Sequence, residues 1–419
     1  MTERADAPGP LLRRGPRPLL LHLMLGMLRS SGLPAGWPSS SGDWTSLNAW
    51  GELAAALAAR LQNAVPETSS PAKAGHPRLT AFPAGLDAAL VAGIAAYRRH
   101  PWRRDLPDPP SVWQEGGSRI LDYGSPGSSA GVPVLFVPSL VNRAYVLDLA
   151  PGHSMLRWLA GHGVRPLLLD WGWPDEAERR FTLTDYVAGR LERALVATAA
   201  LAGGAVVLAG YCMGGTLAVA AAERRPDLVR ALALLAAPWD FHAGDPRRAK
   251  LAARCLPLLE PAMAFGGTLP VDWLQVLFTL LDPLGVGEKY RAFSSLDPAS
   301  DRARLFVALE DWLNDGVPLA APVARECLGG WYGENRPAQG TWMVAGLAVD
   351  PRRLRMPTLV VAPGRDRIVP PESARVVAAL ITGAELVEPR AGHIGMMAGS
   401  GAEATLWRVL GEWVGRVAG

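Results

Sequence analysis

From residue 112 onwards the chain alternates short aliphatic runs with longer segments of helical periodicity. The aliphatic runs are rich in Val, Leu and Ala; they span residues 119–123, 132–137, 164–169, 205–208, 231–235, 358–361 and 384–387. Short runs that are apolar at successive positions are typical of parallel strands buried between two layers of helices. The pattern therefore predicts an α/β core, with a mostly parallel sheet and helices on both of its faces.

One interval in this alternation is much longer than a single helical crossover needs. It separates the fifth and sixth aliphatic runs and contains long apolar stretches such as residues 273–281. We interpret residues 239–341 as an inserted helical cap that covers a site. The α/β core would then consist of residues 112–238 and 342–419.

The first 111 residues alternate short helical patterns with Pro, Ser and Gly, which indicates an appended helical extension. Its better helix candidates are residues 47–63 and 86–97. The apolar run at residues 19–28 is too short to span a bilayer as a helix. Three interpretations of this run stay open: a helix packed on the rest of the chain, an amphipathic helix on a lipid or polymer surface, or a signal peptide that lacks a clear cleavage site.

Composition and charge exclude several functional classes. The 42 Lys plus Arg nearly balance the 39 Asp plus Glu, and 49% of the residues are hydrophobic. Disordered, collagen-like and coiled-coil proteins do not have this composition. Basic residues do not form a stripe interleaved with aromatic residues, so we expect no nucleic-acid partner. The arginine-rich run at residues 97–105 indicates either a solvated face or a contact for anionic phosphates.

The three cysteines, Cys212, Cys255 and Cys327, lie far apart in the chain. They show neither the spacing of metal ligands nor that of a disulfide framework. We therefore expect no metal site and a reducing compartment. A reducing compartment implies a cytoplasmic protein. Because no apolar run is long enough for a transmembrane helix, we also predict no membrane span.

The segment 205–222 reads AVVLAGYCMGGTLAVAAA, a strand that runs at once into an Ala-rich helix. We interpret it as a nucleophile elbow with Cys212 in place of serine. A tight strand-to-helix turn crowds the positions two residues before and after the nucleophile, which are Gly210 and Gly214. This turn would hold the sulfur above the first turn of the helix, which favours a thiolate, and would direct the Met213 N–H at an attacked carbonyl. A buried structural cysteine is the alternative.

Acid and base candidates follow the cap. Asp366 comes after the sixth aliphatic run and His393 after the seventh, so both lie at the carboxyl ends of predicted strands, where α/β sheets gather their functional residues. The chain order Cys, Asp, His matches that of the nucleophile-elbow enzymes. We predict Cys212 as nucleophile, His393 as base and Asp366 as the acid. The alternative for Asp366 is an exposed turn carboxylate that pairs with Arg365 or Arg367.

A second donor to the carbonyl oxygen should come from the loop after residues 132–137. In nucleophile-elbow folds this loop lies beside the elbow. The chain reads SLVNR there, and we predict the backbone N–H of Val141 as the oxyanion-hole donor that complements Met213. A plain strand-to-helix connection is the alternative interpretation of this loop.

These segments together resemble the polyhydroxyalkanoate synthase family. The likeness covers most of residues 112–413 and is carried by PVLFVPSLVNRAYVLDL, DWGWPDEAERRF, GYCMGGT, WLNDGVPL, WYGENRP, PTLVVAPGRDRIVPP and AGHIG. The resemblance implies an α/β-hydrolase fold with a cap and a Cys-His-Asp catalytic triad. It also implies an acyltransferase that polymerises (R)-3-hydroxyacyl-CoA into polyhydroxyalkanoate and releases coenzyme A. The CoA thioester is the substrate, and no cofactor is implied.

The resemblance also implies roles and partners. Cys212 would hold the growing acyl chain as a thioester, and His393 would remove the thiol proton and later that of the incoming 3-hydroxyl group. Asp366 would orient His393 or assist that hydroxyl. The implied partners are the hydroxyacyl-CoA, the polyester granule surface, and either a second copy of the chain or an accessory subunit. Arg367 and Pro371 stand where many family members carry His and Trp.

Two other functions stay open from the sequence. An α/β-hydrolase acting as a thioesterase, an esterase or an intracellular polyhydroxyalkanoate depolymerase needs only water in place of the hydroxyl acceptor. A non-catalytic granule-associated protein would not need Cys, His and Asp in this arrangement. The thiol favours acyl transfer, because thioester-to-thioester exchange is nearly balanced in energy, whereas a serine ester is a less activated acyl donor.

Overall fold

The computed structural model describes residues 13–30, 87–124 and 131–418. The chain divides into two compact units: unit 1 comprises Met1–Arg103 and Gln275–Asn314, and unit 2 comprises Arg104–Leu274 and Asp315–Gly419. Residues 239–341, which the sequence suggests as a cap, are thus divided between the two units. The predicted helix at residues 47–63 lies outside the described residues.

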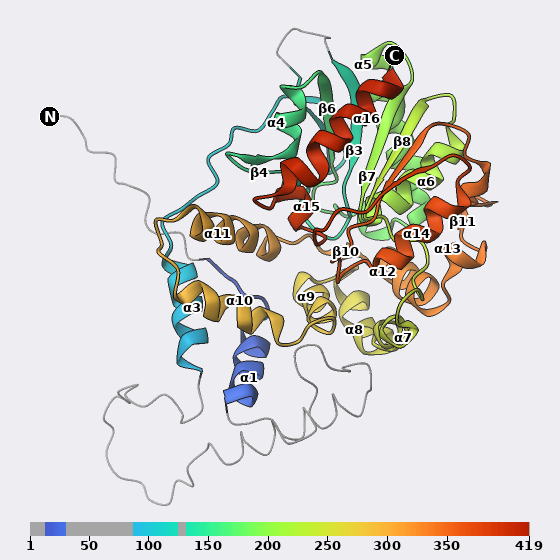
Figure 1. Cartoon of the computed structure of the whole chain (residues 1–419). Helices are drawn as coiled ribbons and strands as arrows, with labels where there is room; N and C mark the ends of the chain where they lie inside the picture. The colour runs from blue at the N-terminus through green and yellow to red at the C-terminus, as the bar shows by residue number, and fades with distance from the viewer. Residues whose placement is uncertain (1–12, 31–86, 125–130, 419) are drawn as a thin grey trace, which may run out of the picture. The chain divides into compact units, whose positions relative to one another are not determined.

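Unit 2 is built on an eight-stranded sheet with the order β1-β2-β6-β3-β7-β8-β13-β14. Figure 1 labels its central strands β6, β3, β7 and β8. The strands are β1 (Ser111–Glu115), β2 (Ser118–Asp122), β3 (Val132–Val137), β6 (Val164–Asp170), β7 (Val206–Tyr211), β8 (Val229–Leu235), β13 (Thr358–Val361) and β14 (Glu385–Val387). The strands from β6 to β14 pair in parallel, and β2 pairs antiparallel with both β1 and β6. The predicted α/β architecture with a mostly parallel sheet is confirmed.

Strand β1 was not expected from the sequence. Its residues, SVWQE, are largely exposed, whereas most residues of the predicted strands are apolar. Strand β1 forms a hairpin with β2 through Gly116, which has a φ of 55° that suits glycine. An edge strand has only one paired side and can stay polar, so an apolar pattern does not reveal it.

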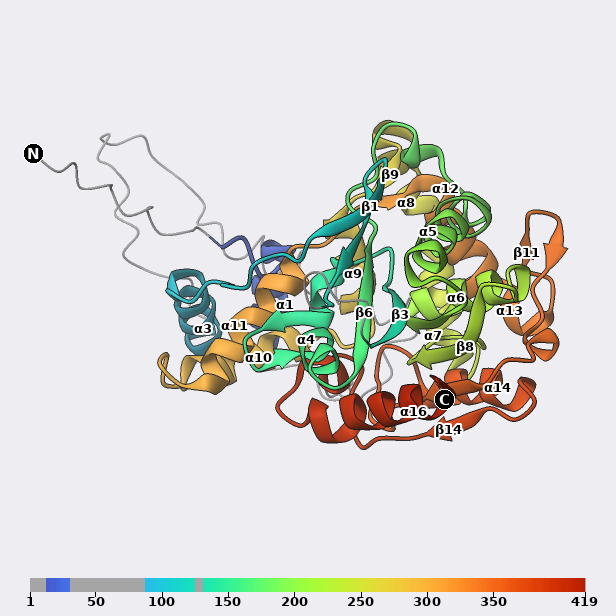
Figure 2. The same ribbon diagram turned by 90° about the horizontal axis from the view of Figure 1, so that it is seen from above.

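Helices cover both faces of the sheet. Helix α6 (Met213–Arg224) contacts β3, β7 and β8, and helix α16 (Arg408–Ala418) contacts β3 and β6. Figure 2 shows these two helices on opposite sides of the sheet. Every residue of β7 is buried, as are residues 213–222 of α6. The small side chains of α6 let it pack closely on the strands, which fixes the position of the β7–α6 turn.

The remaining elements of unit 2 surround this core. They are η1 (Ala144–Leu147), β4 (Asp148–Ala150), β5 (His153–Ser154), α4 (Met155–Ala160), η2 (Glu178–Arg180), η3 (Asp185–Leu191), α5 (Glu192–Ala202), α7 (Pro246–Arg254), α8 (Leu256–Gly266), β9 (Thr268–Leu269), β10 (Leu319–Ala320), α12 (Ala321–Arg325), η4 (Glu326–Gly333), α13 (Arg336–Gln339), β11 (Met343–Val344), β12 (Leu347–Ala348), η5 (Pro351–Arg353), α14 (Pro371–Leu380), α15 (Gly395–Ala398) and η6 (Glu403–Trp407). Helix α9 (Val271–Thr279) runs across the boundary between the units.

Unit 1 has its own apolar core. Its helices are α1 (Leu19–Ser30), α3 (Ala88–Arg99), α10 (Gly285–Ser294) and α11 (Asp301–Asn314). The rings of Tyr97 and Tyr290 meet edge to face, with centroids 5.6 Å apart. Gly93 lets α3 approach α10, because a Cβ at this position would lie 1.9 Å from the Tyr290 carbonyl oxygen. N-terminal helices and residues 275–314 therefore share one core.

The structure bears on two expectations about the N-terminal part of the chain, which concern the apolar run at residues 19–28 and the arginine-rich run at residues 97–105. The apolar run at residues 19–28 forms α1, which contacts α3 and α10, as a packed helix would. In the arginine-rich run, Arg98 donates to the Gly15 carbonyl at 3.0 Å, and Arg104 donates to the Asp148 carboxylate at 2.9 Å. Arg98 and Arg104 of this run therefore form hydrogen bonds with other parts of the same chain. No helix among the described residues is long and apolar enough to cross a membrane.

Candidate active site

The turn between β7 and α6 holds Cys212 in a strained backbone conformation. Its φ of 55° and ψ of −130° are rare for a residue with a side chain. The Cys212 N–H donates to the Leu235 carbonyl at 2.9 Å, and its carbonyl accepts from the Gly215 N–H at 2.9 Å. These bonds tie the turn to strand β8 and to the start of α6. The Cys212 side chain stays partly accessible at the carboxyl edge of the sheet.

Glycines allow this turn to close. A Cβ on Gly210 would lie 2.4 Å from the Gly215 Cα, and a Cβ on Gly214 would lie 2.1 Å from the Val137 carbonyl oxygen. No side chain fits at such distances. Gly215, which the sequence prediction did not single out, is equally crowded, because its Cβ would lie 2.4 Å from the Ala237 Cβ.

Asp366 is buried in the loop that follows β13. Its Oδ1 accepts from the backbone N–H groups of Ile368 and Val369, at 2.8 and 2.9 Å. Its Oδ2 lies 2.6 Å from Nδ1 of the buried His393, in the loop that follows β14. The exposed turn carboxylate considered from the sequence is therefore not what the structure shows. Because an ionised carboxylate only accepts hydrogen bonds, Nδ1 of His393 carries a proton.

The side chain of Cys212 lies within interaction range of the His393 ring, because it contributes to the pKa of this histidine. Nε2 is the ring nitrogen that the contact with Asp366 leaves available to Cys212. Burial opposes protonation of the ring. The charge of Cys212, followed by the interactions with the Asp366 carboxylate, nevertheless raises the pKa of His393 to about 10. A protonated His393 would favour a thiolate beside it.

Tyr211, the residue before Cys212, supports the His393 loop. Its hydroxyl donates to the His393 carbonyl at 3.3 Å, and the two rings lie 5.0 Å apart. Burial, with the charges of Cys212 and Asp366, raises the pKa of the Tyr211 phenol well above its usual value. Tyr211 is thus a neutral hydrogen-bond donor in this site.

The two predicted oxyanion-hole donors are in different situations. Met213 is the first residue of α6, so its backbone N–H has no carbonyl partner within the helix. The Val141 N–H instead donates to the Ser139 Oγ at 3.1 Å. Val141 can serve an oxyanion only if the Ser139 hydroxyl releases it.

Tyr332 was missed as a site residue by the sequence prediction, although its segment, WYGENRP, was noticed. It lies in the π-helical turn η4, and its ring packs against Phe241 with centroids 5.1 Å apart. Its carbonyl bonds Nε2 of His242 at 2.9 Å. Burial and then the charge of Cys212 raise the pKa of the Tyr332 phenol, so this group lies within electrostatic range of Cys212.

Comparisons with known proteins place the chain in a family. The family model described as "Alpha/beta hydrolase family" matches residues 134–405. Poly(3-hydroxyalkanoate) polymerase subunit PhaC of Haloferax mediterranei is 32% identical over 308 residues, which are 72% of this chain and 62% of that protein. The PhaC of Synechocystis sp. is 32% identical over 302 residues, 68% of this chain and 77% of that protein. The chain belongs to the PhaC family of alpha/beta hydrolases.

A third PhaC-family relative has a similar extent. The subunit of Allochromatium vinosum is 29% identical over 289 residues, which are 68% of this chain and 80% of the relative. The chain spans less than two thirds of the Haloferax protein, at 62% of its length. The family and its fold follow from these matches. The residues that carry the chemistry are argued from the geometry above.

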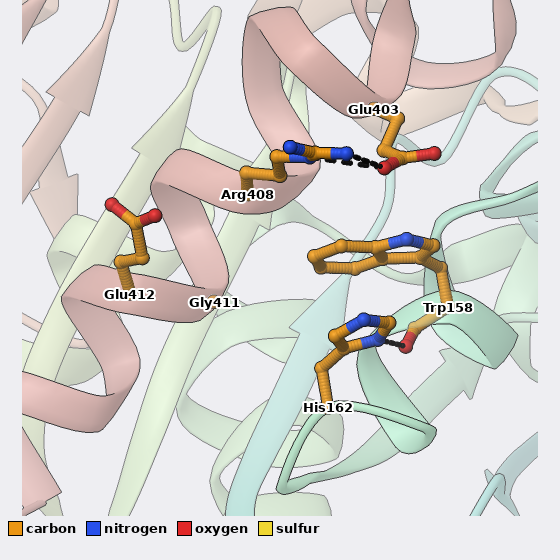
Figure 3. A pocket seen from close by; sticks show the side chains of 6 residues that line it. All are labelled: Trp158, His162, Glu403, Arg408, Gly411 and Glu412. Carbon is orange, nitrogen blue, oxygen red and sulfur yellow. Dashed lines mark hydrogen bonds and ion pairs between the residues drawn. The ribbon is translucent and has the colours of Figure 1, made fainter.

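A surface pocket of this PhaC-family protein lies away from Cys212. It has a volume of about 430 Å³ and is lined by residues of α4, η6 and α16 and by His162 (Figure 3). The His162 ring stacks on Trp158 with centroids 3.8 Å apart, and Arg408 pairs with Glu403. None of the predicted site residues lines the pocket. Among the residues that the structure describes, no group of three His, Cys, Asp or Glu is arranged to hold a metal ion.

We expect the His393 imidazolium to control the reactivity of Cys212. In the native protein, Cys212 should react readily with iodoacetamide at pH 7, because His393 keeps its proton up to about pH 10 and a neighbouring cation favours the thiolate. In His393→Gln, the rate should fall by at least ~10-fold at pH 7 and rise with pH towards an ordinary thiol pKa of about 8.5. Mass spectrometry of the modified peptides gives the rate at each cysteine.

Cys327 serves as the internal reference for this measurement. It is buried, and burial raises its thiol pKa, so its modification should be slow in both proteins. Equal alkylation rates at Cys212 in the native protein and in His393→Gln would contradict the proposed pairing.

Proposed function

We propose that this protein is an acyltransferase that polymerises (R)-3-hydroxyacyl-CoA into polyhydroxyalkanoate through a thioester on Cys212, with release of CoA. The observation that carries the proposal is the strained Cys212, within interaction range of a histidine that is itself bonded to the buried Asp366, in a member of the PhaC family. Cys212, His393 and Asp366 would act as the catalytic triad. Met213 and Val141 would supply the oxyanion hole.

The first half-reaction loads the enzyme. Nε2 of His393 accepts the thiol proton, and the Cys212 sulfur attacks the acyl carbonyl. The backbone N–H of Met213 stabilises the oxyanion, and the Val141 N–H joins it once the bond to Ser139 opens. The bond from the acyl carbon to the CoA sulfur then breaks, and His393 returns the proton to the leaving CoA thiolate.

The second half-reaction lengthens the chain. The neutral His393 accepts the proton of the 3-hydroxyl group of another hydroxyacyl-CoA, and the hydroxyl oxygen attacks the thioester on Cys212. An ester bond forms, and the Cys212 sulfur leaves as a thiolate beside the imidazolium. The lengthened chain ends in a CoA thioester, which Cys212 attacks in the next cycle. Asp366 holds the His393 ring in the orientation that both proton transfers need.

The choice of nucleophile supports acyl transfer over hydrolysis. A thioester on Cys212 keeps the activation that the CoA thioester had, so a hydroxyl group can still displace the sulfur. The polyester would grow outward from the site, and we propose that the enzyme works at the surface of its granule, with a second copy or an accessory subunit as partner.

The products of the reaction test the proposal directly. Purified protein is incubated with (R)-3-hydroxybutyryl-CoA, and free thiol, free 3-hydroxybutyrate and insoluble polyester are measured together. We expect polyester to account for most of the thiol released. Thiol release with only the free acid would replace the polymerase by a thioesterase. A protein that releases no thiol but coats granules in cells would be a non-catalytic member of the family.

A further inference from the structure

Helix α8 has an apolar face that is exposed to solvent. All of its exposed residues are apolar, namely Pro257, Leu258, Pro261, Ala264 and Phe265. Leu258 is 75% exposed and Phe265 is 97% exposed. These positions recur at spacings of three and four residues, so they lie along one side of the helix. The buried residues Leu259 and Met263 lie on the opposite side.

This face of α8 carries no free charge. Glu260 is the one charged residue in the sequence of the helix, and its carboxylate pairs with the Arg325 guanidinium at 3.0 Å. Large apolar side chains that are exposed together on a folded protein typically mark a surface that contacts a partner or a membrane.

Helix α7, which precedes α8, has basic residues in the exposed positions. They are Arg247, Arg248, Lys250 and Arg254. Asp245 pairs with Arg247 at 3.0 Å, whereas Lys250 and Arg254 form no ion pair with any residue that the structure describes. Together with the apolar face of α8, these basic side chains make up what we call the α7–α8 surface.

The basic and apolar parts of this surface adjoin. Only Cys255 separates the two helices, and its φ of −72° and ψ of −17° keep the backbone helical through the junction. Residues four apart on a helix are neighbours on the same side. The exposed Arg254 and Leu258 are therefore neighbours, and Lys250 lies one turn further along α7.

We propose that the α7–α8 surface docks on an anionic phospholipid layer. Residues 245–266 contain four basic and two acidic side chains, and both acidic groups are paired with arginine. Lys and Arg beside an apolar helix face are attracted to anionic headgroups, while the apolar side chains enter the acyl region. A polyester surface is uncharged and gives Lys250 and Arg254 no role. A second copy of the same surface would bring like charges together.

The α7–α8 surface is separate from the catalytic residues but belongs to the same unit. Helix α7 contacts η4, the turn that carries Tyr332. Figure 1 shows α7 and α8 below the sheet, apart from the helices that cover its faces. Docking at this surface requires no chemistry at Cys212. The inference can therefore hold or fail independently of the proposed function.

Vesicle binding by the full chain tests the inference. Sedimentation is measured with vesicles of phosphatidylcholine and with vesicles of phosphatidylcholine and phosphatidylglycerol in equal parts. Each basic group near an anionic lipid surface contributes about fivefold, so K250Q/R254Q should bind the anionic vesicles at least ~10-fold more weakly than the native protein. L258S/F265S should also lose at least ~10-fold, because two large apolar side chains no longer leave water on binding. All four side chains are exposed, so both variants should keep the native circular dichroism and thermal transition.

Two double variants of unit 2 serve as matched controls. V196S/L201S removes two exposed apolar side chains of α5, and R230Q/R416Q removes two exposed charges at the amino edge of the sheet. Both should bind vesicles as the native protein does.

Several results would overturn the inference. They are equal affinity of the native protein for neutral and anionic vesicles, unchanged vesicle binding by K250Q/R254Q or L258S/F265S, and an equal loss in the control variants. Binding to particles of amorphous polyhydroxybutyrate but not to vesicles would assign the face to the polymer instead. A dimer that light scattering detects in the native protein but not in L258S/F265S, without vesicle binding, would assign it to a second copy.

Discussion

Replacing Cys212 with alanine should lower kcat for thioester turnover by at least ~10³-fold, because a nucleophile and its base act as a unit and little catalysis survives the loss of either. The substitution removes one sulfur atom from a turn whose shape depends on backbone bonds to Leu235 and Gly215. The fold should therefore be preserved. The measurement is thiol release from (R)-3-hydroxybutyryl-CoA, together with polyester formation in cells.

Cys255 provides the matched control for this prediction. It is a second free cysteine of unit 2, half-buried at the start of α8, and burial raises the pKa of its thiol. Cys255→Ala should keep the native rate within about twofold, since no group that could activate the thiol contributes to its pKa. Activity of Cys212→Ala within tenfold of native would contradict the enzymatic proposal. Unchanged granule formation in cells with Cys212→Ala would instead favour the non-catalytic protein.

The sequence predicts most of the sheet well because its central strands are buried on both faces. A strand such as β7 has to be apolar at every position, and that constraint is visible in the residues themselves. Strand β1 is paired on one side and exposed, so nothing in its composition distinguishes it from a loop. The association of α3 with α10 is also invisible in the sequence, because it depends on contacts such as Gly93 with Tyr290 between distant segments.

Some residues of the candidate site could likewise be predicted from the sequence, and others could not. Cys212, Asp366 and His393 could be placed from the sequence, because each follows a predicted strand and parallel strands bring their carboxyl ends to one edge. The loop that contains the Val141 N–H could be identified from the sequence. The hydrogen bond of this N–H to Ser139 could not, because it depends on the local backbone conformation. Tyr332 lies in a turn within a long helical segment. The hydrophobic periodicity of that segment does not indicate that the Tyr332 phenol lies within electrostatic range of Cys212.

Replacing Asp366 with asparagine should lower kcat by at least ~10²-fold while the protein stays folded. The carbonyl oxygen of the introduced side chain can still accept the two backbone N–H groups of the loop, at the position of the present Oδ1. Its amide NH₂ would then face Nδ1 of His393 and donate to it. The ring proton would move to Nε2, so His393 would present a donor to Cys212 where catalysis needs an acceptor.

The pH dependence distinguishes this positioning role from a loss of structure. At present Asp366 helps to raise the pKa of His393, so its removal should lower that pKa and reduce alkylation of Cys212 at pH 7. Asp227→Asn is the control, because Asp227 is a carboxylate of unit 2 that pairs with Arg225 before β8, at the opposite edge of the sheet. If Asp366→Asn kept both its turnover and its Cys212 alkylation rate within tenfold of native, the carboxylate would not orient the base. In that case, the Tyr211 hydroxyl and the packing of the His393 loop would have to hold His393 in place. These contacts reach the His393 carbonyl and its ring, but they leave the ring free to change tautomer.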